Sequence, residues 1–315
     1  MEYKINFVNN SYRRFAAQHE QELKDAFWDC VSKGNLILRE DVSKFEDNLA
    51  KFVGVGFAAG VGSGTDSLIL ACKALGIGKG DEVIVPGHTF AASFGCVMEV
   101  GATPILIDVR SDELMDVTLL EDLVTSKTKA IIPVHFHGKI CDMDEVMRVA
   151  KKYNLFVIED ACQALGSSYK GKRAGSFGDF GCFSFNTPKL LGSWGDSGGI
   201  VTNNKALIEK IYLLRNHYNM AQTSVRMADF PTPEVVRWSG KSRLDNIQAA
   251  LLNIKWKYFD QMLARRREIA DMYCAGLKDL PLKLPTYTSE DVIQEFIIRI
   301  GDPVDRKSTR LNSSH

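Results

Sequence analysis

The chain has 315 residues, of which 45% are apolar and 25% are charged, as in ordinary soluble globular proteins. Its 39 basic residues balance its 39 acidic residues, so net charge does not direct it to nucleic acid or to an anionic membrane. No apolar run is long enough to cross a bilayer, and the first residues lack the apolar core of a secretory signal, so we expect a cytoplasmic protein.

The first fifty residues predict two helices, one over 15–33 that ends at Gly34 and one over 42–52 that ends at Gly54. From Phe57 onward, short apolar runs alternate with amphipathic stretches, a pattern typical of strands joined by helical crossovers in a mostly parallel sheet. The predicted strands are FAAGV, EVIVP, TPILIDV, AIIPVHF, LFVIED, GCFSF and GGIVTN. We therefore predict an α/β fold with a mostly parallel seven-stranded sheet flanked by helices.

Beyond the last of these strands, the pattern changes. A helix is predicted over 207–215, followed by an irregular stretch over 220–237 that contains two prolines. A long helix over 244–277 has an apolar face, and the apolar segment 291–300 is predicted to be a strand. Such a helix commonly connects a large domain to a small one.

These elements predict a large domain with N-terminal helices over 1–243, and a bridging helix with an incomplete small α/β domain over 244–304. The tail over 305–315 has no periodicity and is similar to the translation of a common sequencing adapter. We expect this tail to be an unstructured artefact and exclude it from the fold.

Ligands of open α/β sheets bind beyond the carboxyl ends of the strands, so the residues that follow the predicted strands are the candidates for chemistry. Asp160 ends the buried strand LFVIED. An unpaired carboxylate there would be costly to desolvate, and a cation such as a protonated pyridine nitrogen would offset that cost. The alternative is an aspartate that caps the next helix.

Lys189 follows the strand GCFSF after a short loop, with Ser184 at the end of that strand. At the edge of a sheet crevice, burial can lower the pKa of a lysine and free its amine to form a Schiff base. A lone lysine in a loop is more often a solvated surface residue. The interpretation of Lys189 therefore depends on the other residues of the pattern.

The segment GSGTDSL, 62–68, places small residues before a helix, where free backbone N–H groups could hold a phosphate with help from the Thr65 hydroxyl. The alternative is a simple helix cap.

Two further patterns indicate other kinds of site. GDSGG resembles the motif around the serine of chymotrypsin-like proteases, but Ser197 lacks the β-barrel and histidine context of that class. His135, His137 and Cys141 fit no common zinc spacing, so no metal site is predicted.

Together, SGTD, PGHTF, EDACQA, GSFGDFGCFSFNTPK and GDSGGIVTN resemble the DegT/DnrJ/StrS sugar aminotransferases, within the fold type I enzymes that use pyridoxal 5′-phosphate. The resemblance implies that Lys189 holds the cofactor as a Schiff base and shuttles a proton, and that Asp160 keeps the pyridine nitrogen protonated. It also implies cofactor contacts from the ring-binding residues Phe90 and Gln163, and from the phosphate-binding residues Gly64, Thr65, Asp66 and Ser184.

One position departs from the family pattern Gly-x-Asn-x-Arg, in which the asparagine reaches the phosphate of the partner subunit. Lys241 stands in its place and can still neutralise a phosphate. The resemblance implies a homodimer with its active site at the subunit interface, acting in amino sugar and polysaccharide biosynthesis. Its partners would be L-glutamate and a nucleotide-linked keto sugar.

Two alternatives remain open at this point. One is a pyridoxal-phosphate-dependent sugar dehydratase or other lyase on the same scaffold, although related dehydratases carry a histidine where Lys189 stands. The other is a non-catalytic regulator that binds the cofactor without turnover.

Overall fold

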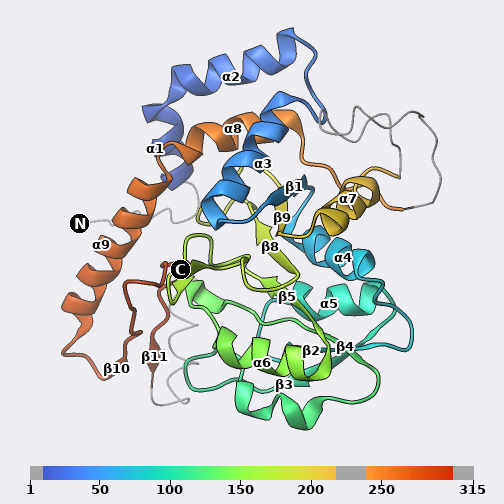
Figure 1. Cartoon of the computed structure of the whole chain (residues 1–315). Coiled ribbons are helices and arrows are strands. Elements are labelled where there is room, and N and C mark those ends of the chain that lie inside the picture. The colour runs from blue at the N-terminus through green and yellow to red at the C-terminus, as the bar shows by residue number, and fades with distance from the viewer. Residues whose placement is uncertain (1–9, 218–238, 301–315) are drawn as a thin grey trace, which may run out of the picture.

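The computed structural model describes residues 10–217 and 239–300 (Figure 1). A seven-stranded sheet forms its centre, in the order β1-β9-β8-β5-β4-β2-β3. β9 runs antiparallel to both of its neighbours, whereas the other adjacent strands pair in parallel. The strands are β1 (Phe57–Val61), β2 (Glu82–Pro86), β3 (Thr103–Ile107), β4 (Thr128–Ile131), β5 (Phe156–Asp160), β8 (Phe180–Ser184) and β9 (Gly198–Thr202).

The predicted fold class is therefore confirmed. Six of the seven strands lie at their expected places, whereas the strand predicted over 130–136 forms earlier, as β4. Because only β9 is reversed, the carboxyl ends of β1, β5 and β8 all lie at the same edge of the sheet. That edge is where ligands of open α/β sheets bind.

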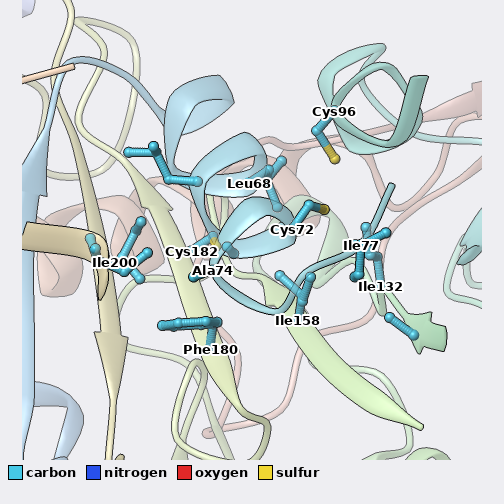
Figure 2. Close-up of a cluster of buried hydrophobic side chains, with 14 of the residues drawn as sticks. Leu68, Cys72, Ala74, Ile77, Cys96, Ile132, Ile158, Phe180, Cys182 and Ile200 are labelled. Atoms are coloured by element: carbon cyan, nitrogen blue, oxygen red, sulfur yellow. The ribbon is translucent and has the colours of Figure 1, made fainter. Parts of the chain in front are cut away.

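Helices cover both faces of the sheet (Figure 1). One face packs against α4 (Gly64–Ala74), α5 (Ala92–Glu99) and α7 (Lys205–Leu214). Figure 2 shows Leu68 and Cys72 of α4 in the apolar layer with Ile158 and Phe180 of the strands. A fully buried leucine or phenylalanine contributes ~1.5–3 kcal/mol to folding, so this layer fixes α4 against the sheet.

The other face carries two further apolar clusters. α3 (Glu40–Val53) and α8 (Asn246–Trp256) bury Phe45 and Leu252 there, and α6 (Met143–Tyr153) buries Val146 against the far strands. Phe45 also packs edge-on against Phe185, at a distance of 5.0 Å between ring centroids. This contact supports the chain just beyond β8.

Two predicted helices are each broken in the structure. The helix expected over 15–33 is α1 (Asn10–Gln18) and α2 (Glu20–Ser32), separated at His19, and the helix expected over 244–277 is α8 and α9 (Phe259–Leu277). The ring of His19 stacks on Tyr258, with 4.0 Å between centroids. Both breaks therefore lie at one tertiary contact, which a helical period cannot reveal. The other two predicted helices are confirmed as α3 and α7.

The strand predicted over 291–300 is wrong for most of its length. Only Arg299–Ile300 (β11) is a strand, paired with Leu282–Lys283 (β10). The preceding residues are irregular because their backbone groups bond to the His137–Gly138 turn: Val292 N donates to Gly138 O at 3.1 Å. A short hairpin, β6 (Ser168–Tyr169) with β7 (Lys172–Arg173), was not predicted.

The predicted irregular stretch 220–237 and the predicted tail 305–315 lie outside the described residues. Within the described parts of the chain, no helix combines the length and the apolar character needed to span a membrane.

Candidate active site

The carboxyl ends of β1, β5 and β8 converge at Gly64, the first residue of α4. A Cβ atom at Gly64 would lie 2.6 Å from the Ser184 Cβ and 3.0 Å from the Cys162 Sγ, closer than side chains pack. Only glycine therefore lets the start of α4 contact the end of β8. The three loops that the sequence singles out, around Gly64, Asp160 and Ser184, meet at one place.

The N-terminus of α4 forms the first wall of this site. Ser63 caps the helix in an extended conformation, and its hydroxyl accepts a hydrogen bond from the Asp66 N–H at 3.0 Å. The Asp66 amide, predicted to bind phosphate, is thus already used by Ser63. The N–H groups at the start of a helix have no acceptor inside the helix and carry the positive end of its dipole, so Gly64 and Thr65 present an anion-binding end.

Asp160 forms the floor of the site. It ends β5, and only 6% of its surface is exposed. Its carboxylate accepts hydrogen bonds from the Ser93 hydroxyl at 2.7 Å and from the Cys162 N–H at 3.2 Å. Among the described residues, Asp160 forms no ion pair. A buried carboxylate held only by neutral donors is stabilised by any cation that binds against it.

Gln163 lies three residues beyond Asp160, and its orientation is fixed by His137. The backbone N–H of His137 donates to the Gln163 Oε1 at 2.8 Å. His137 adopts a left-handed backbone conformation, with φ 56°, which turns this N–H toward Gln163. Because the amide oxygen is occupied, the Gln163 side chain offers its amide nitrogen to a ligand as a donor.

Lys189 lies in the loop after β8, half-buried in a turn in which its N–H donates to Asn186 O at 2.9 Å. Its ammonium makes no hydrogen bond or ion pair with any described residue. Burial raises the pKa of the Cys162 thiol well above its usual range; Asp160 raises it further, and Lys189 opposes that rise. The charges of Asp160 and Lys189 therefore both act on the Cys162 side chain.

The remaining predicted residues lie around this space. Phe90, after β2, is 68% exposed, so its ring is available for stacking. Lys241 is exposed, and its backbone pairs with that of Asn216 in a single antiparallel β-bridge. Its neighbour Ser242, which the sequence did not single out, connects to the α4 end: its hydroxyl accepts from Gly62 N at 3.0 Å and donates to Asp66 at 2.8 Å.

Of the residues in the two alternative motifs, His137 contacts Gln163, whereas Ser197 and His135 make other contacts. Ser197 is buried, and its hydroxyl donates to Ser193 at 3.1 Å. His135 is buried against Glu159, at 2.9 Å between ring nitrogen and carboxylate. Across residues 10–217 and 239–300, no group of three or more His, Cys, Asp or Glu side chains is arranged to hold a metal.

A cavity of about 670 Å³ opens beside Lys189, between α1, α8, α9 and the chain around Gln294. We call it the basic cavity because its charged lining residues are lysines and arginines. Burial, followed by the nearby charge of Arg266, lowers the pKa of Lys255 in its wall to about 8. The lining contains no carboxylate, and its cationic side chains are Arg14, Lys189, Lys255, Arg265 and Arg266.

Known proteins resemble this chain along nearly its whole length. The family model of the DegT/DnrJ/EryC1/StrS aminotransferases matches residues 17–312. The dTDP-3-amino-3,6-dideoxy-alpha-D-galactopyranose transaminase of Aneurinibacillus thermoaerophilus is 40% identical over 92% of this chain and 78% of its own length.

Solved structures of aminotransferases also resemble this chain. DesV of S. venezuelae in complex with a ketimine intermediate has a TM-score of 0.87 at 34% identity, over 96% of this chain and 79% of that chain. The sugar aminotransferase Spr1654 of Streptococcus pneumoniae in its PLP form has a TM-score of 0.83 at 26% identity, over 93% of this chain and 79% of that chain.

The described residues fit pyridoxal 5′-phosphate. The carboxylate of Asp160, which has no ion-pair partner among these residues, suits a protonated ring nitrogen, and the helix N-terminus at Gly64, which lies against Ser184, suits a phosphate. The amine of Lys189 donates no hydrogen bond to the described residues, although its charge acts on Glu295, and it suits an aldehyde. With this site and these relatives, the chain belongs to the DegT/DnrJ/EryC1/StrS aminotransferase family, whose members are pyridoxal-phosphate-dependent enzymes.

Proposed function

We propose that this protein transfers the amino group of L-glutamate to a keto sugar carried on a nucleotide, with pyridoxal 5′-phosphate as cofactor. The proposal depends on two groups whose charges both act on Cys162. Among the described residues, the buried carboxylate of Asp160 pairs with no cation, and the amine of Lys189 donates no hydrogen bond. The named activities of the relatives, transamination of a dTDP-linked sugar among them, support the substrate class.

Each residue has a defined task in this reaction. When bound, pyridoxal 5′-phosphate supplies an aldehyde that accepts the amino group and a ring that withdraws electrons from the substrate carbon. Asp160 holds a proton on the ring nitrogen, because its desolvated carboxylate is stabilised by the resulting positive charge. Gln163 donates its amide N–H to the phenolic oxygen. With the cofactor bound, Lys189 Nζ would accept the proton from the substrate carbon and release it to the carbon of the cofactor's aldehyde group.

The phosphate is proposed to lie at the N-terminus of α4. Gly64 and Thr65 offer their backbone N–H groups, and the hydroxyls of Thr65 and Ser184 add donors. Asp66 contributes through Ser242, which its carboxylate holds against Gly62. Phe90 stacks on the ring, and Lys241 adds a positive charge near the phosphate.

The basic cavity supports an anionic sugar substrate. Five cationic side chains line its walls without a carboxylate, so two linked phosphates would be attracted to it. A bound phosphate also raises the pKa of Lys255 from about 8, because a nearby negative charge favours the protonated amine. Tighter binding of the sugar nucleotide than of the free sugar is the expected consequence.

We further infer a cytoplasmic homodimer whose active sites lie at the subunit interface, with a large domain over 1–243 and a bridging helix and small domain over 244–304. The exposed position of Lys241, near the α4 end, supports a role toward a second subunit. Mixing the inactive variants Lys189→Ala and Lys241→Ala tests this arrangement. Activity should return in the mixture if Lys241 acts across the interface, and no recovery would place it in its own subunit.

The half-reaction with glutamate tests the function directly. The cofactor-loaded protein is mixed with L-glutamate and no sugar, and the ring absorbance and 2-oxoglutarate are followed. Conversion to the pyridoxamine form with equimolar 2-oxoglutarate is expected, and Lys189→Ala should not convert. A cofactor that stays unchanged in glutamate would overturn transamination and favour the dehydratase or the regulator.

A further inference from the structure

Gln294 grips the chain on both sides of Lys189. Its side-chain oxygen accepts a hydrogen bond from Leu190 N at 3.2 Å, and its side-chain nitrogen donates to Pro188 O at 3.2 Å. Both halves of one amide are therefore used on the two residues that flank Lys189. Gln294 is 8% exposed, so water does not readily replace either bond.

The Lys189 loop needs such support because its backbone does not pair with a neighbouring strand. The loop runs from the end of β8 to Gly195, and its backbone is irregular. Besides the turn at Asn186, its backbone is held at Phe185, where Ser193 N donates to Phe185 O at 2.7 Å. Farther along the loop, Lys255 donates to Gly192 O, and the Gln248 amide bonds to Trp194. Without Gln294, the Leu190 N–H would lose its acceptor in a buried environment.

Gln294 is itself held rigidly from two directions. Arg266 of α9 donates to the carbonyl oxygens of Ile293 and Gln294, each at 3.2 Å. On the other side, Gln294 N donates to His137 O at 3.4 Å, and Glu295 meets the His137 ring nitrogen at 2.8 Å. The same His137 fixes the orientation of Gln163 through its own N–H.

One short segment, 292–295, therefore connects the two proposed ring contacts, Gln163 and Lys189. We propose that Gln294 is a positioning residue that holds the Lys189 amine in reach of the cofactor aldehyde. This inference rests on the proposed function, because it assigns Lys189 the bond to the cofactor. In this role Gln294 acts through the Lys189 loop, although it also lines the basic cavity.

The consequence is kinetic. The phosphate end and Asp160 bind the cofactor independently of Gln294, so its loss leaves cofactor binding largely intact. A loosened loop samples many lysine positions, and a displacement of an ångström or so in a reacting group can slow its reaction by one to two orders of magnitude. Bond formation between Lys189 and the aldehyde should therefore slow more than binding weakens.

The test uses Gln294→Met, which keeps the length and removes both hydrogen bonds. Apoprotein is mixed with pyridoxal 5′-phosphate, and the absorbance of the lysine-bound form is followed with time and across pH, while total bound cofactor is measured after desalting. We expect bond formation at least about tenfold slower than in the native protein, a shifted pH midpoint, and cofactor retention close to native.

Gln248 provides a matched control. It holds the same loop in the same way, accepting from Trp194 N and donating to Trp194 O, each at 3.1 Å, but five residues beyond Lys189. Gln248→Met should react at nearly the native rate. Equal rates for native protein and Gln294→Met, or equal slowing in both variants, would overturn the proposal.

A second variant keeps the test decisive if Gln294→Met does not fold. Gln294→Glu retains the acceptor for Leu190 N but repels Pro188 O, and an intermediate rate is expected; a native rate would overturn the proposal.

Failure of the proposed function can be distinguished from failure of the proposal for Gln294. A native protein that bonds the cofactor through Lys189 but does not react with glutamate refutes transamination and leaves the Gln294 result standing. Absence of any lysine bond in the native protein overturns both.

Discussion

Asp160 ends β5, whereas Asp179 directly precedes β8 and contacts the beginning of β5, so the environments of the two carboxylates differ. Asp179 accepts a hydrogen bond from Val157 N at 2.9 Å, and burial raises its pKa. Asp160 is more deeply buried and faces the space shared with Lys189. The Asp179 carboxylate accepts a backbone hydrogen bond at the amino end of β5, whereas the Asp160 carboxylate at the carboxyl end is available to a ligand.

Replacing Asp160 with Asn should leave part of the cofactor binding and reduce the glutamate half-reaction by about a hundredfold or more. Asparagine keeps the shape but cannot hold a positive ring nitrogen. Single-turnover kinetics with loaded protein measure the effect. Asp179→Asn is the matched control, and its rate should remain near native. Comparable losses in both variants would show that Asp160 acts through strand stability alone.

His135 and Glu159 form a buried pair directly behind Asp160. Burial lowers the pKa of His135, but its hydrogen bonds with Cys141 and Glu159 outweigh burial and raise that pKa to about 9. Glu159 also accepts from the backbone N–H groups of Gly175, Phe177 and Gly178, at 2.7 to 2.8 Å. The charged histidine therefore stabilises a carboxylate that ties the turn before β8 to β5.

The pair makes stability depend on pH. The folded-state pKa of His135 lies above its ordinary value of 6.5, so the folded state binds the proton more tightly than the unfolded chain. The stabilisation is complete below about pH 6.5 and is lost as the pH rises through about 9. Urea unfolding at several pH values should show a weaker decline in His135→Gln than in the native protein. Replacement of the exposed His88 should leave the native slope, and identical slopes in all three proteins would contradict the assignment.

The residues found from sequence and those missed differ in where they lie. Asp160 and Lys189 follow predicted strands, where sheet topology directs attention. Ser93, Ser242 and Gln294 lie in or next to other elements and reach the site only through the fold. Their short local patterns resemble ordinary polar surface, so no motif distinguished them.

At the scale of elements, the apolar runs predicted the strands because each buried strand needs a continuous apolar segment. The helix boundaries were harder to predict. The contact between His19 and Tyr258 interrupts two helices at once, and the irregular segment 292–295 uses its backbone for His137. In both cases a contact between distant parts of the chain overrode local periodicity.

The start of α4 is the element on which phosphate binding depends. Gly64→Ala would place a methyl group 2.6 Å from the Ser184 Cβ, which forces the helix end away from β8. Cofactor affinity should fall by about tenfold or more, as measured by fluorescence titration of apoprotein. Gly95→Ala, inside α5 with open space around it, should bind normally. Native affinity in Gly64→Ala would contradict a phosphate site at this end.

At the scale of the whole molecule, the parallel direction of β1, β5 and β8 explains why residues nearly 130 positions apart form one site. The alternation of strands and helices predicted this architecture, because crossover helices impose parallel strands. The strand order and the position of 292–295 against the Lys189 loop were beyond the sequence. They depend on packing between clusters of apolar residues that no single segment specifies.

Chemical trapping tests the central claim most directly. Protein loaded with pyridoxal 5′-phosphate is reduced with borohydride and digested, and the modified peptide is sequenced by mass spectrometry, with Lys189→Ala treated in parallel. The account predicts that the label lies on Lys189 in the native protein and is absent from the variant. A label on another lysine, or equal labelling of the variant, would contradict it.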